Sequence, residues 1–368
     1  MTITAITMPK WGLTMTEGKV VAWLKPQGAA FAPGEELLEI ETSKITNVVE
    51  AESPGTLLRI VAPEGSTLPI GALLAVVAPE TTPAAEIDRF VAGFVVPEPA
   101  ADASAETDAP APRDIEAAGQ RLRYLELGSG GGVPVLLLHG FGADLNSWMF
   151  TQPALSDGRR TIALDLPGHG GSAKDVGRGD VDALTDAVEA ALRVLDIDRV
   201  HLVGHSMGGA VAAALAARQP DRVAKLTLIA SAGLGPEINA TFIDGFVRAE
   251  RRRDVEAVLR LLVHDPALVS RAMIEDVLRY KRLDGVAAAL ETIAGAWFPD
   301  GRQTYDLVTA LPMPVQLIWG RDDRIVPVAH AEALAARLPV HILADAGHLP
   351  HMEKSGAVNA LIRRFIEG

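Results

Sequence analysis

A glycine-flanked serine between an apolar run and an alanine-rich run is the strongest constraint on how this chain can fold. The segment reads Val-Gly-His-Ser-Met-Gly-Gly over residues 203–209, and residues 210–217 are mostly alanine. The apolar run favours a strand, alanine favours a helix, and glycine permits a sharp turn between them. Ser206 would stand at the apex, beside helical N–H groups that can stabilise an oxyanion. A glycine-rich turn that contains serine by chance would have the same local pattern. The function of this segment must therefore be judged from the residues around it.

Length and composition narrow the class of protein. The 368 residues suffice for two or more domains, and 48% apolar content can fill a sizeable core. The chain has no cysteine, which excludes disulfides and thiolate chemistry and suits a reducing compartment. A net charge of −13 argues against nucleic acid, and no apolar window is long enough for a membrane span. We therefore expect a cytoplasmic protein with no metal site and no nucleic-acid or membrane partner.

An internal repeat organises residues 1–80. Six positions recur at an offset of 37 residues, pairing Gly18, Pro26, Gly28, Gly34, Leu37 and Ile40 with Gly55, Pro63, Gly65, Gly71, Leu74 and Val77. Each half consists of a short apolar run, a Pro-x-Gly turn and a second apolar run. Short strands with regularly spaced turn residues predict a small β-sandwich of two similar halves.

A single lysine, Lys44, lies between the two halves. The surrounding segment 41–46 interrupts the apolar pattern, which predicts an exposed hairpin. A lone surface lysine is normally only solvated. The placement of Lys44 near the centre of the repeat, however, resembles lipoyl domains, and the resemblance covers about residues 3–79. It implies that Lys44 carries covalent lipoate. Biotin carriers share this fold, but their lysine is usually flanked by methionines, which are absent here.

Two different segments follow the sandwich. Apolar residues at helical spacing, Ile87, Phe90, Val91 and Phe94, predict a short amphipathic helix within residues 81–96. This helix would either pack on the sandwich or dock a partner enzyme. Residues 97–112 are rich in proline and alanine, which predicts a flexible linker. Such a tether would raise the local concentration of Lys44 at other sites.

The remaining residues, 113–368, alternate between strand and helix patterns. Strands are predicted at residues 122–127, 134–138, 161–164, 199–203, 223–229, 315–319 and 340–343. Helices are predicted at residues 182–195, 330–338 and 355–366, besides the one after Ser206. This alternation predicts a parallel sheet covered by helices. Residues from about 236 to 310 break the alternation with helical periodicity alone, which predicts an inserted helical cap.

The order of three residue types along this region resembles the α/β-hydrolase fold. The family places a serine nucleophile first, an acid after a late strand next, and a histidine near the C-terminus last. Ser206, Asp323 and His348 match that order, with Asp322 and His351 as neighbouring alternatives. The resemblance implies that His348 is the base, that Asp323 orients it, and that the N–H groups of Met207 and Phe141 hold the oxyanion.

The whole chain combines a lipoyl-type sandwich with an α/β-hydrolase fold and a helical cap. This organisation resembles the dihydrolipoyl acetyltransferase components of acetoin dehydrogenase complexes. The resemblance implies acetyl transfer from dihydrolipoyl-lysine to coenzyme A through an acyl-serine. It also implies a homo-oligomer with two partners: a thiamine diphosphate-dependent, acetoin-cleaving enzyme and dihydrolipoyl dehydrogenase. The His-x-x-x-Asp-Gly motif of ordinary lipoyl acyltransferases is absent, because Tyr280 stands where Asp284-Gly285 would require histidine.

Two other functions remain open from the sequence. The chain could be a lipoyl-tethered esterase or thioesterase, since water competes with any thiol acceptor, or a carrier whose catalytic domain is vestigial. Transfer would need a site for coenzyme A, and two basic runs in the cap could meet its phosphates: Arg248 with Arg251, Arg252 and Arg253, and Arg279 with Lys281 and Arg282. The first run is also typical of a solvated helix face, because acidic residues balance it.

Overall fold

The computed structural model describes residues 3–9, 11, 15–42, 46–51, 53–96, 110–303 and 311–368. The chain divides into two compact units, Met1–Ala109 and Pro110–Gly368. Lys44 and residues 97–109 of the expected linker lie outside the described residues. Within the described ranges, no helix has the length and apolar character needed to cross a membrane.

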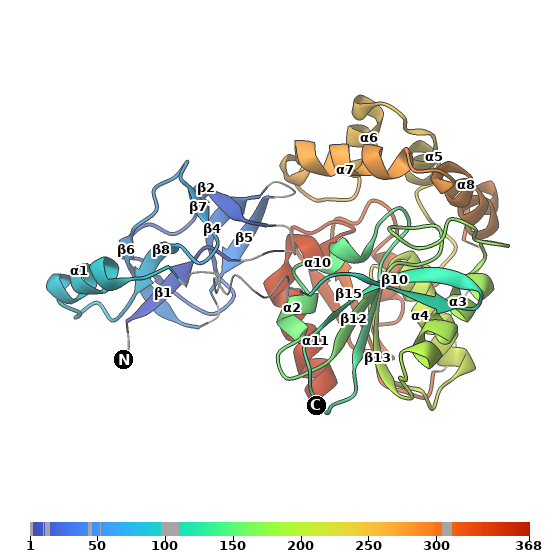
Figure 1. Ribbon diagram of the computed structural model, residues 1–368, viewed down its shortest axis with the longest axis horizontal. Coiled ribbons are helices and arrows are strands. Elements are labelled where there is room, and N and C mark those ends of the chain that lie inside the picture. Colours follow the sequence, from blue (N-terminus) through green and yellow to red (C-terminus); the bar gives the residue numbers. More distant parts are fainter. Residues whose placement is uncertain are drawn as a thin grey trace, which may run out of the picture. The chain divides into compact units, whose positions relative to one another are not determined.

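The first unit is a sandwich of two four-stranded antiparallel sheets (Figure 1). One sheet has the strand order β1 (Thr4–Thr7), β8 (Leu73–Val77), β6 (Gly55–Ile60) and β3 (Ala30–Phe31). The other has the order β5 (Thr46–Glu50), β4 (Glu36–Glu41), β2 (Glu17–Trp23) and β7 (Thr67–Pro69). Apolar side chains of both sheets, including Val20, Ile40, Leu57 and Leu74, are fully buried in a common core. The sandwich predicted from the repeat is confirmed.

The sequence repeat is also a repeat of hydrogen bonds. The amide of Gly28 donates to the carbonyl of Leu57 at 2.7 Å, and the amide of Gly65 donates to the carbonyl of Val20 at 2.8 Å. Donor and acceptor are each displaced by the same 37 positions. Both glycines adopt positive φ, +91° and +84°, a conformation that residues with a Cβ rarely adopt. The two halves therefore interlock as approximate two-fold mates.

Helix α1 (Ala84–Gly93) packs on this sandwich. Ile87 is buried against Leu73 and Val76, and Asp88 forms an ion pair with Arg59 at 3.0 Å. The amphipathic stripe therefore covers the unit's own sheet.

The second unit is built on an eight-stranded sheet whose central strands are parallel. Its order is β16 (Val340–Leu343), β15 (Val315–Gly320), β14 (Val223–Ile229), β13 (Val200–His205), β11 (Val135–Leu138), β12 (Thr161–Leu164), β10 (Gln120–Leu127) and β9 (Arg113–Ala117). Strands β10 and β9 are antiparallel and form one edge. The central strands are buried on both faces, which explains why they read as continuous apolar runs. Strand β9 was not expected, because an exposed edge strand carries mostly polar residues.

Helices cover both faces of this sheet (Figure 1). Helices α3 (Val181–Val194) and α4 (Met207–Arg218) pack together on one face, and α2 (Gln152–Leu155) and α11 (Ser355–Glu367) lie together on the other. The helix expected over residues 330–338 is wrong in extent. Only α9 (Ala329–Glu332) is helical, because several following amides, such as those of Ala335 and Arg337, bond three residues back.

Among the described residues between β14 and β15, four helices form the cap: α5 (Ala240–Arg248), α6 (Arg252–Leu259), α7 (Arg271–Lys281) and α8 (Val286–Trp297) (Figure 1). Two 3₁₀ turns accompany them, Pro266–Leu268 and Pro299–Gly301. Trp297 Nε1 donates to Gly179 at 2.8 Å and the Tyr280 hydroxyl donates to Gly168 at 2.9 Å. Both acceptors belong to the segment after β12, so the cap covers the carboxyl end of the parallel strands.

Candidate active site

Ser206 sits at a strained turn between β13 and α4. Its φ and ψ are +52° and −118°, a region that costs a residue with a side chain roughly 1–3 kcal/mol. The turn is held by hydrogen bonds of the Ser206 backbone: its amide donates to Ile229 at 3.0 Å, and its carbonyl accepts from Gly209 and Ala232. The serine is buried at 7% exposure, at the carboxyl end of the central strand.

The flanking glycines are required by close contacts. A Cβ on Gly204 would lie 2.4 Å from the carbonyl oxygen of Gly208, and one on Gly208 would lie 2.3 Å from that of Leu138. Backbone atoms cannot yield to such an overlap. The glycine spacing in the sequence therefore has a steric cause, which makes a chance glycine-rich turn a poor explanation.

His348 and Asp323 form a buried pair in the loops after β16 and β15. Nδ1 of His348 lies 2.8 Å from Oδ2 of Asp323, and the two side chains are 3% and 0% exposed. The other carboxylate oxygen, Oδ1, accepts from the amides of Ile325 and Val326 at 2.8 and 3.0 Å. A carboxylate held in this way fixes the orientation of the imidazole and can stabilise its protonated form.

The neighbouring alternatives take other positions. Asp322 is half-exposed and bonds to Nδ1 of His264 at 2.8 Å, away from His348. The ring of His351 packs between those of Trp148 and His205, with centroids 4.8 and 4.6 Å away. Burial lowers the pKa of His351 to about 3. The geometry thus pairs Asp323 and His348 and gives Asp322 and His351 no part in that pair.

His205, which the sequence did not single out, joins the histidine loop to the serine turn. Nε2 of His205, the residue before Ser206, donates to the carbonyl of His348 at 2.8 Å. Its ring lies 4.8 Å from that of His348. Burial lowers the pKa of His205 well below its usual range, so the ring stays neutral. The glycine-x-serine pattern leaves this position free, and no other feature of the sequence pointed to it.

The predicted oxyanion donors flank the same turn. Met207 begins α4, and Phe141 follows Gly140, where an added Cβ would lie 3.1 Å from that of Ser206. In the described part of the chain, no protein group accepts a hydrogen bond from the amide of Met207 or Phe141. Unpaired amides beside a nucleophile are the donors that an oxyanion hole needs.

His139 fixes the strand end that leads into Phe141. Its Nε2 accepts from the amide of Leu166 at 3.0 Å, so the proton is on Nδ1, which donates to Gly140 at 2.8 Å. Burial lowers the pKa of His139 to about 4. This histidine therefore packs and positions the loop.

The other predicted functional residue, Lys44, cannot be placed by geometry, because it lies outside the described residues. The strands on either side are described: β4 and β5 pair antiparallel, and Glu41 faces Thr46 at their last register position. In the sequence, Lys44 lies between these two paired strands. A lysine amine is the group that an amide-linked lipoate requires.

The two basic runs of the cap differ in their contacts. Lys281 donates through Nζ to the carbonyls of Phe246 and Val247, at the end of α5. Arg279 bonds to Asp276 at 3.0 Å. Arg251, Arg252 and Arg253 are exposed at the start of α6. The lysine of the second run is thus engaged within the protein, whereas the first run faces solvent.

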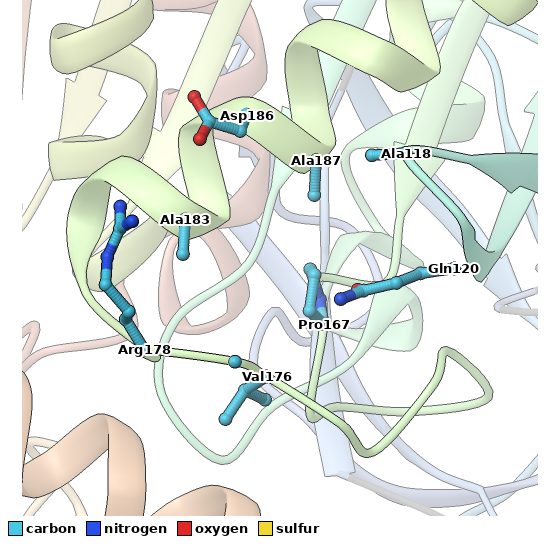
Figure 2. Close-up of a pocket in the computed structure, with 9 residues that line it drawn as sticks. Ala118, Gln120, Pro167, Val176, Arg178, Ala183, Asp186 and Ala187 are labelled. Atoms are coloured by element: carbon cyan, nitrogen blue, oxygen red, sulfur yellow. The ribbon is translucent and has the colours of Figure 1, made fainter.

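Two further features lie away from Ser206. Among the described residues, His264, Asp322 and Asp345 form one group that could hold a metal ion, with ligand atoms within 4.8 Å of one another. A cleft of about 300 Å³ lies between the β9–β10 turn and α3, and Figure 2 shows Gln120 across it from Arg178 and Asp186. None of the predicted catalytic residues lines this cleft.

The parallel sheet, the strained serine turn and the buried His348–Asp323 pair define a serine-dependent enzyme of the α/β-hydrolase type. Residues 133–355 match the alpha/beta hydrolase fold family, and residues 4–77 match the family described as "Biotin-requiring enzyme", which covers biotin and lipoyl domains. The chain belongs to the α/β-hydrolase family and joins that fold to a lipoyl-type domain.

Relatives that match nearly the whole chain share a specific name. The chain is 48% identical to the dihydrolipoyllysine-residue acetyltransferase component of the acetoin cleaving system of Pseudomonas putida, over 99% of this chain and 98% of that protein. It is 43% identical to the protein of the same name from Cupriavidus necator, over 100% and 98%. A meta-cleavage product hydrolase from Pseudomonas fluorescens is 26% identical, with a TM-score of 0.63 over 69% of this chain and 97% of that one.

Proposed function

We propose that this protein is the acetyltransferase of an acetoin cleaving system, moving an acetyl group from a lipoyl arm on Lys44 to coenzyme A. The observation that carries the proposal is the presence, in one chain, of a lipoyl-type sandwich and an α/β-hydrolase site. A lipoyl arm carries acyl groups as thioesters, and a serine nucleophile accepts acyl groups from thioesters. Relatives that match both units over their full length bear the corresponding name.

The first half-reaction follows from the residues at the turn. Lipoate on Lys44 supplies the thiol that holds the acetyl group. His348 removes the proton from Ser206 Oγ, which forms a bond to the thioester carbonyl carbon. The amides of Met207 and Phe141 stabilise the oxyanion; one such donor typically contributes about 3 kcal/mol. The C–S bond then breaks, and His348 returns the proton to the leaving thiolate.

The second half-reaction reverses these roles with a different thiol. His348 takes the proton of the coenzyme A thiol, whose sulfur attacks the acyl-serine carbonyl. The C–O bond to Ser206 breaks, and His348 protonates the serine oxygen. Asp323 stabilises the imidazolium in both halves. No oxidant or metal is needed, and the site returns to its initial state.

Hydrolysis is the second candidate function, because similar folds include hydrolases such as the Pseudomonas fluorescens protein. Transfer requires that the thiol reach the acyl-serine before water does. The cap covers the carboxyl end of the strands through contacts such as Tyr280 with Gly168, and it offers exposed arginines for the phosphates of coenzyme A. A carrier with a vestigial site is disfavoured, because such a chain would have no reason to keep the His348–Asp323 pair.

We also propose partner enzymes and a cytoplasmic location for this protein. The names of the relatives make them components of a cleaving system, which implies other subunits. We infer a thiamine diphosphate-dependent enzyme that loads the arm, dihydrolipoyl dehydrogenase that reoxidises it, and a homo-oligomeric state. A cytoplasmic location suits the absence of cysteine.

The test uses the purified full-length protein with S-acetyl-dihydrolipoamide and coenzyme A, and measures acetyl-coenzyme A and acetate separately. We expect acetyl-coenzyme A as the main product. Acetate released at an unchanged rate when coenzyme A is omitted would make the protein a lipoyl-tethered hydrolase.

A further inference from the structure

A carboxylate beyond the Ser-His-Asp set holds the loop of the catalytic histidine. Glu353 ends the short helix α10 (Pro350–Glu353). Its Oε1 accepts from the amide of Gly347 at 2.8 Å and from that of Leu349 at 3.3 Å, the two residues that flank His348. Burial raises the pKa of Glu353 above its usual range, although backbone donors oppose that shift.

The second oxygen of the same carboxylate reaches into the cap. Oε2 of Glu353 accepts from the amide of His264 at 2.6 Å. The amide of His348 itself donates to the carbonyl of Leu262 at 2.7 Å. The amides of Gly347, His348 and Leu349 are thus all bonded either to Glu353 or to the cap segment 262–264, which follows α6.

The approach between the two segments depends on a glycine. A Cβ on Gly347 would lie 2.8 Å from Leu262 O, Val263 C and His264 N. Since these are backbone atoms, a side chain at position 347 would push the cap segment away from the histidine loop. Glycine at position 347 therefore allows the close contact with the cap segment.

The loop of the catalytic acid contacts the same cap segment. Nη2 of Arg324, the residue after Asp323, donates to the carbonyls of Val263 and His264 at 3.0 and 3.2 Å. Asp322 bonds to the side chain of His264. Cap residues 262–264 thus join the loops of Asp323 and His348, which come from different strands.

We infer that Glu353 is a positioning residue: by binding the backbone on both sides of His348 and the amide of His264, it makes the orientation of the catalytic histidine depend on the seated cap. The inference rests on the proposed role of His348 as base, but not on which acceptor receives the acyl group. Its expected signature is a loss of chemical rate with little loss of substrate binding. A misplacement of a catalytic group by about 1 Å can cost about 100-fold in rate.

The test compares Glu353→Ala, Glu353→Gln and the control Glu332→Ala in the full-length protein. Glu332 is an exposed glutamate that pairs with Arg321, beside the acid loop, at 2.7 Å. Two rates are measured: the burst of p-nitrophenol that reports acetylation of Ser206 by p-nitrophenyl acetate, and coenzyme A-dependent transfer with its KM. The burst tests Glu353 even if the chain proves to be a hydrolase, because acetylation precedes the choice of acceptor.

We expect Glu353→Ala to lower the burst rate and kcat about 100-fold, with KM for coenzyme A changed less than about threefold. Glu353→Gln keeps one acceptor for the histidine loop but loses the acceptor for His264, so its rates should be intermediate. Glu332→Ala should match the parent. If Glu353→Ala does not fold, the burst and transfer rates of Glu353→Gln test the inference. A folded Glu353 variant with parental burst rate, or a loss confined to KM, overturns the inference.

Discussion

The two units of this protein place their functional residues by different means. In the lipoyl-type unit, bonds such as Gly28 to Leu57 and Gly65 to Val20 repeat with the sequence, and the predicted attachment residue, Lys44, lies in the sequence between two strands that pair with each other. In the catalytic unit, His205 and His348 are 143 positions apart, yet must meet at hydrogen-bond distance. The lipoyl-type unit therefore rests on contacts that repeat between its two halves, whereas the catalytic unit depends on distant segments holding one another in place.

The largest expected effect is the loss of a reaction that needs both units, while a reaction that needs only the catalytic unit is unchanged. Lys44→Arg should abolish transfer that depends on the chain's own lipoyl arm, because arginine cannot form the lipoyl amide. It should leave reaction with free S-acetyl-dihydrolipoamide unchanged. Intact-protein mass spectrometry checks lipoylation, and product analysis checks the two reactions. Loss of activity toward the free substrate as well would show that the units do not work independently.

Within the catalytic unit, the acid should matter only through its contact with His348. Asp323→Asn removes the carboxylate that orients the imidazole, and kcat should fall about a thousandfold or more. Asp322→Asn is the matched control one position away, and its kcat should stay within a few-fold of the parent's. Steady-state kinetics with the free thioester give both values. The opposite ranking would make Asp322 the acid.

Acidification should distinguish the units by their stability. All nine histidines lie in residues 110–368. Seven of them are buried. For five of these seven, the pKa in the folded state lies well below 6.5, mainly because burial disfavours charge: His139, His169, His201, His205 and His351. Such groups bind protons only in the unfolded chain, so the stability they confer is complete above pH 6.5 and is lost as pH falls toward about 4.

At pH 5 this linkage destabilises the catalytic unit, because its unfolded chain binds protons that the folded state excludes. Asp165 has the opposite effect on stability. Burial raises its pKa to about 7, so the folded state binds this proton more tightly than the unfolded chain does and is stabilised as pH falls. We expect the catalytic unit to open before the lipoyl-type unit between pH 6.5 and 5. Hydrogen-exchange pulses after equilibration at each pH can resolve the units. Simultaneous opening, or earlier opening of residues 1–96, would contradict this reading.

The smallest expected effect tests the two-fold character of the carrier. Gly28→Ala and Gly65→Ala each force a Cβ into positive φ with no clashing neighbour, so each should destabilise the unit by about 1 kcal/mol. The two losses should be equal within error in denaturant unfolding followed at this unit. Gly93→Ala, near the end of α1 without positive φ, is the control and should not destabilise. Unequal losses would mean that the halves are not energetically equivalent.

The sequence predicted most of what depends on local pattern. The repeat led to the sandwich, and apolar runs located the central strands of the parallel sheet. Strand β9 was not predicted, because its exposed edge residues are polar. The helix predicted over residues 330–338 was too long, because apolar spacing does not distinguish an α-helix from successive turns.

The site was predictable where a residue has an unusual local setting. Ser206 is marked by its glycines, and chain order pointed to Asp323 and His348, whose side chains the structure pairs. His205 and Glu353 act through contacts with segments far away in the sequence, and each looks ordinary among its neighbours. Such contacts become visible only once the cap and the two catalytic loops are seen together.

The measurement that tests the central claim most directly is a single turnover followed at Ser206. The lipoylated protein is mixed with S-acetyl-dihydrolipoamide, a sample is quenched, and coenzyme A is added to the rest; peptide mass spectrometry locates the acetyl group. The account predicts acetyl on the Ser206 peptide, released by coenzyme A as acetyl-coenzyme A, and neither event in Ser206→Ala. Acetyl-coenzyme A formed at the parental rate by Ser206→Ala would contradict it.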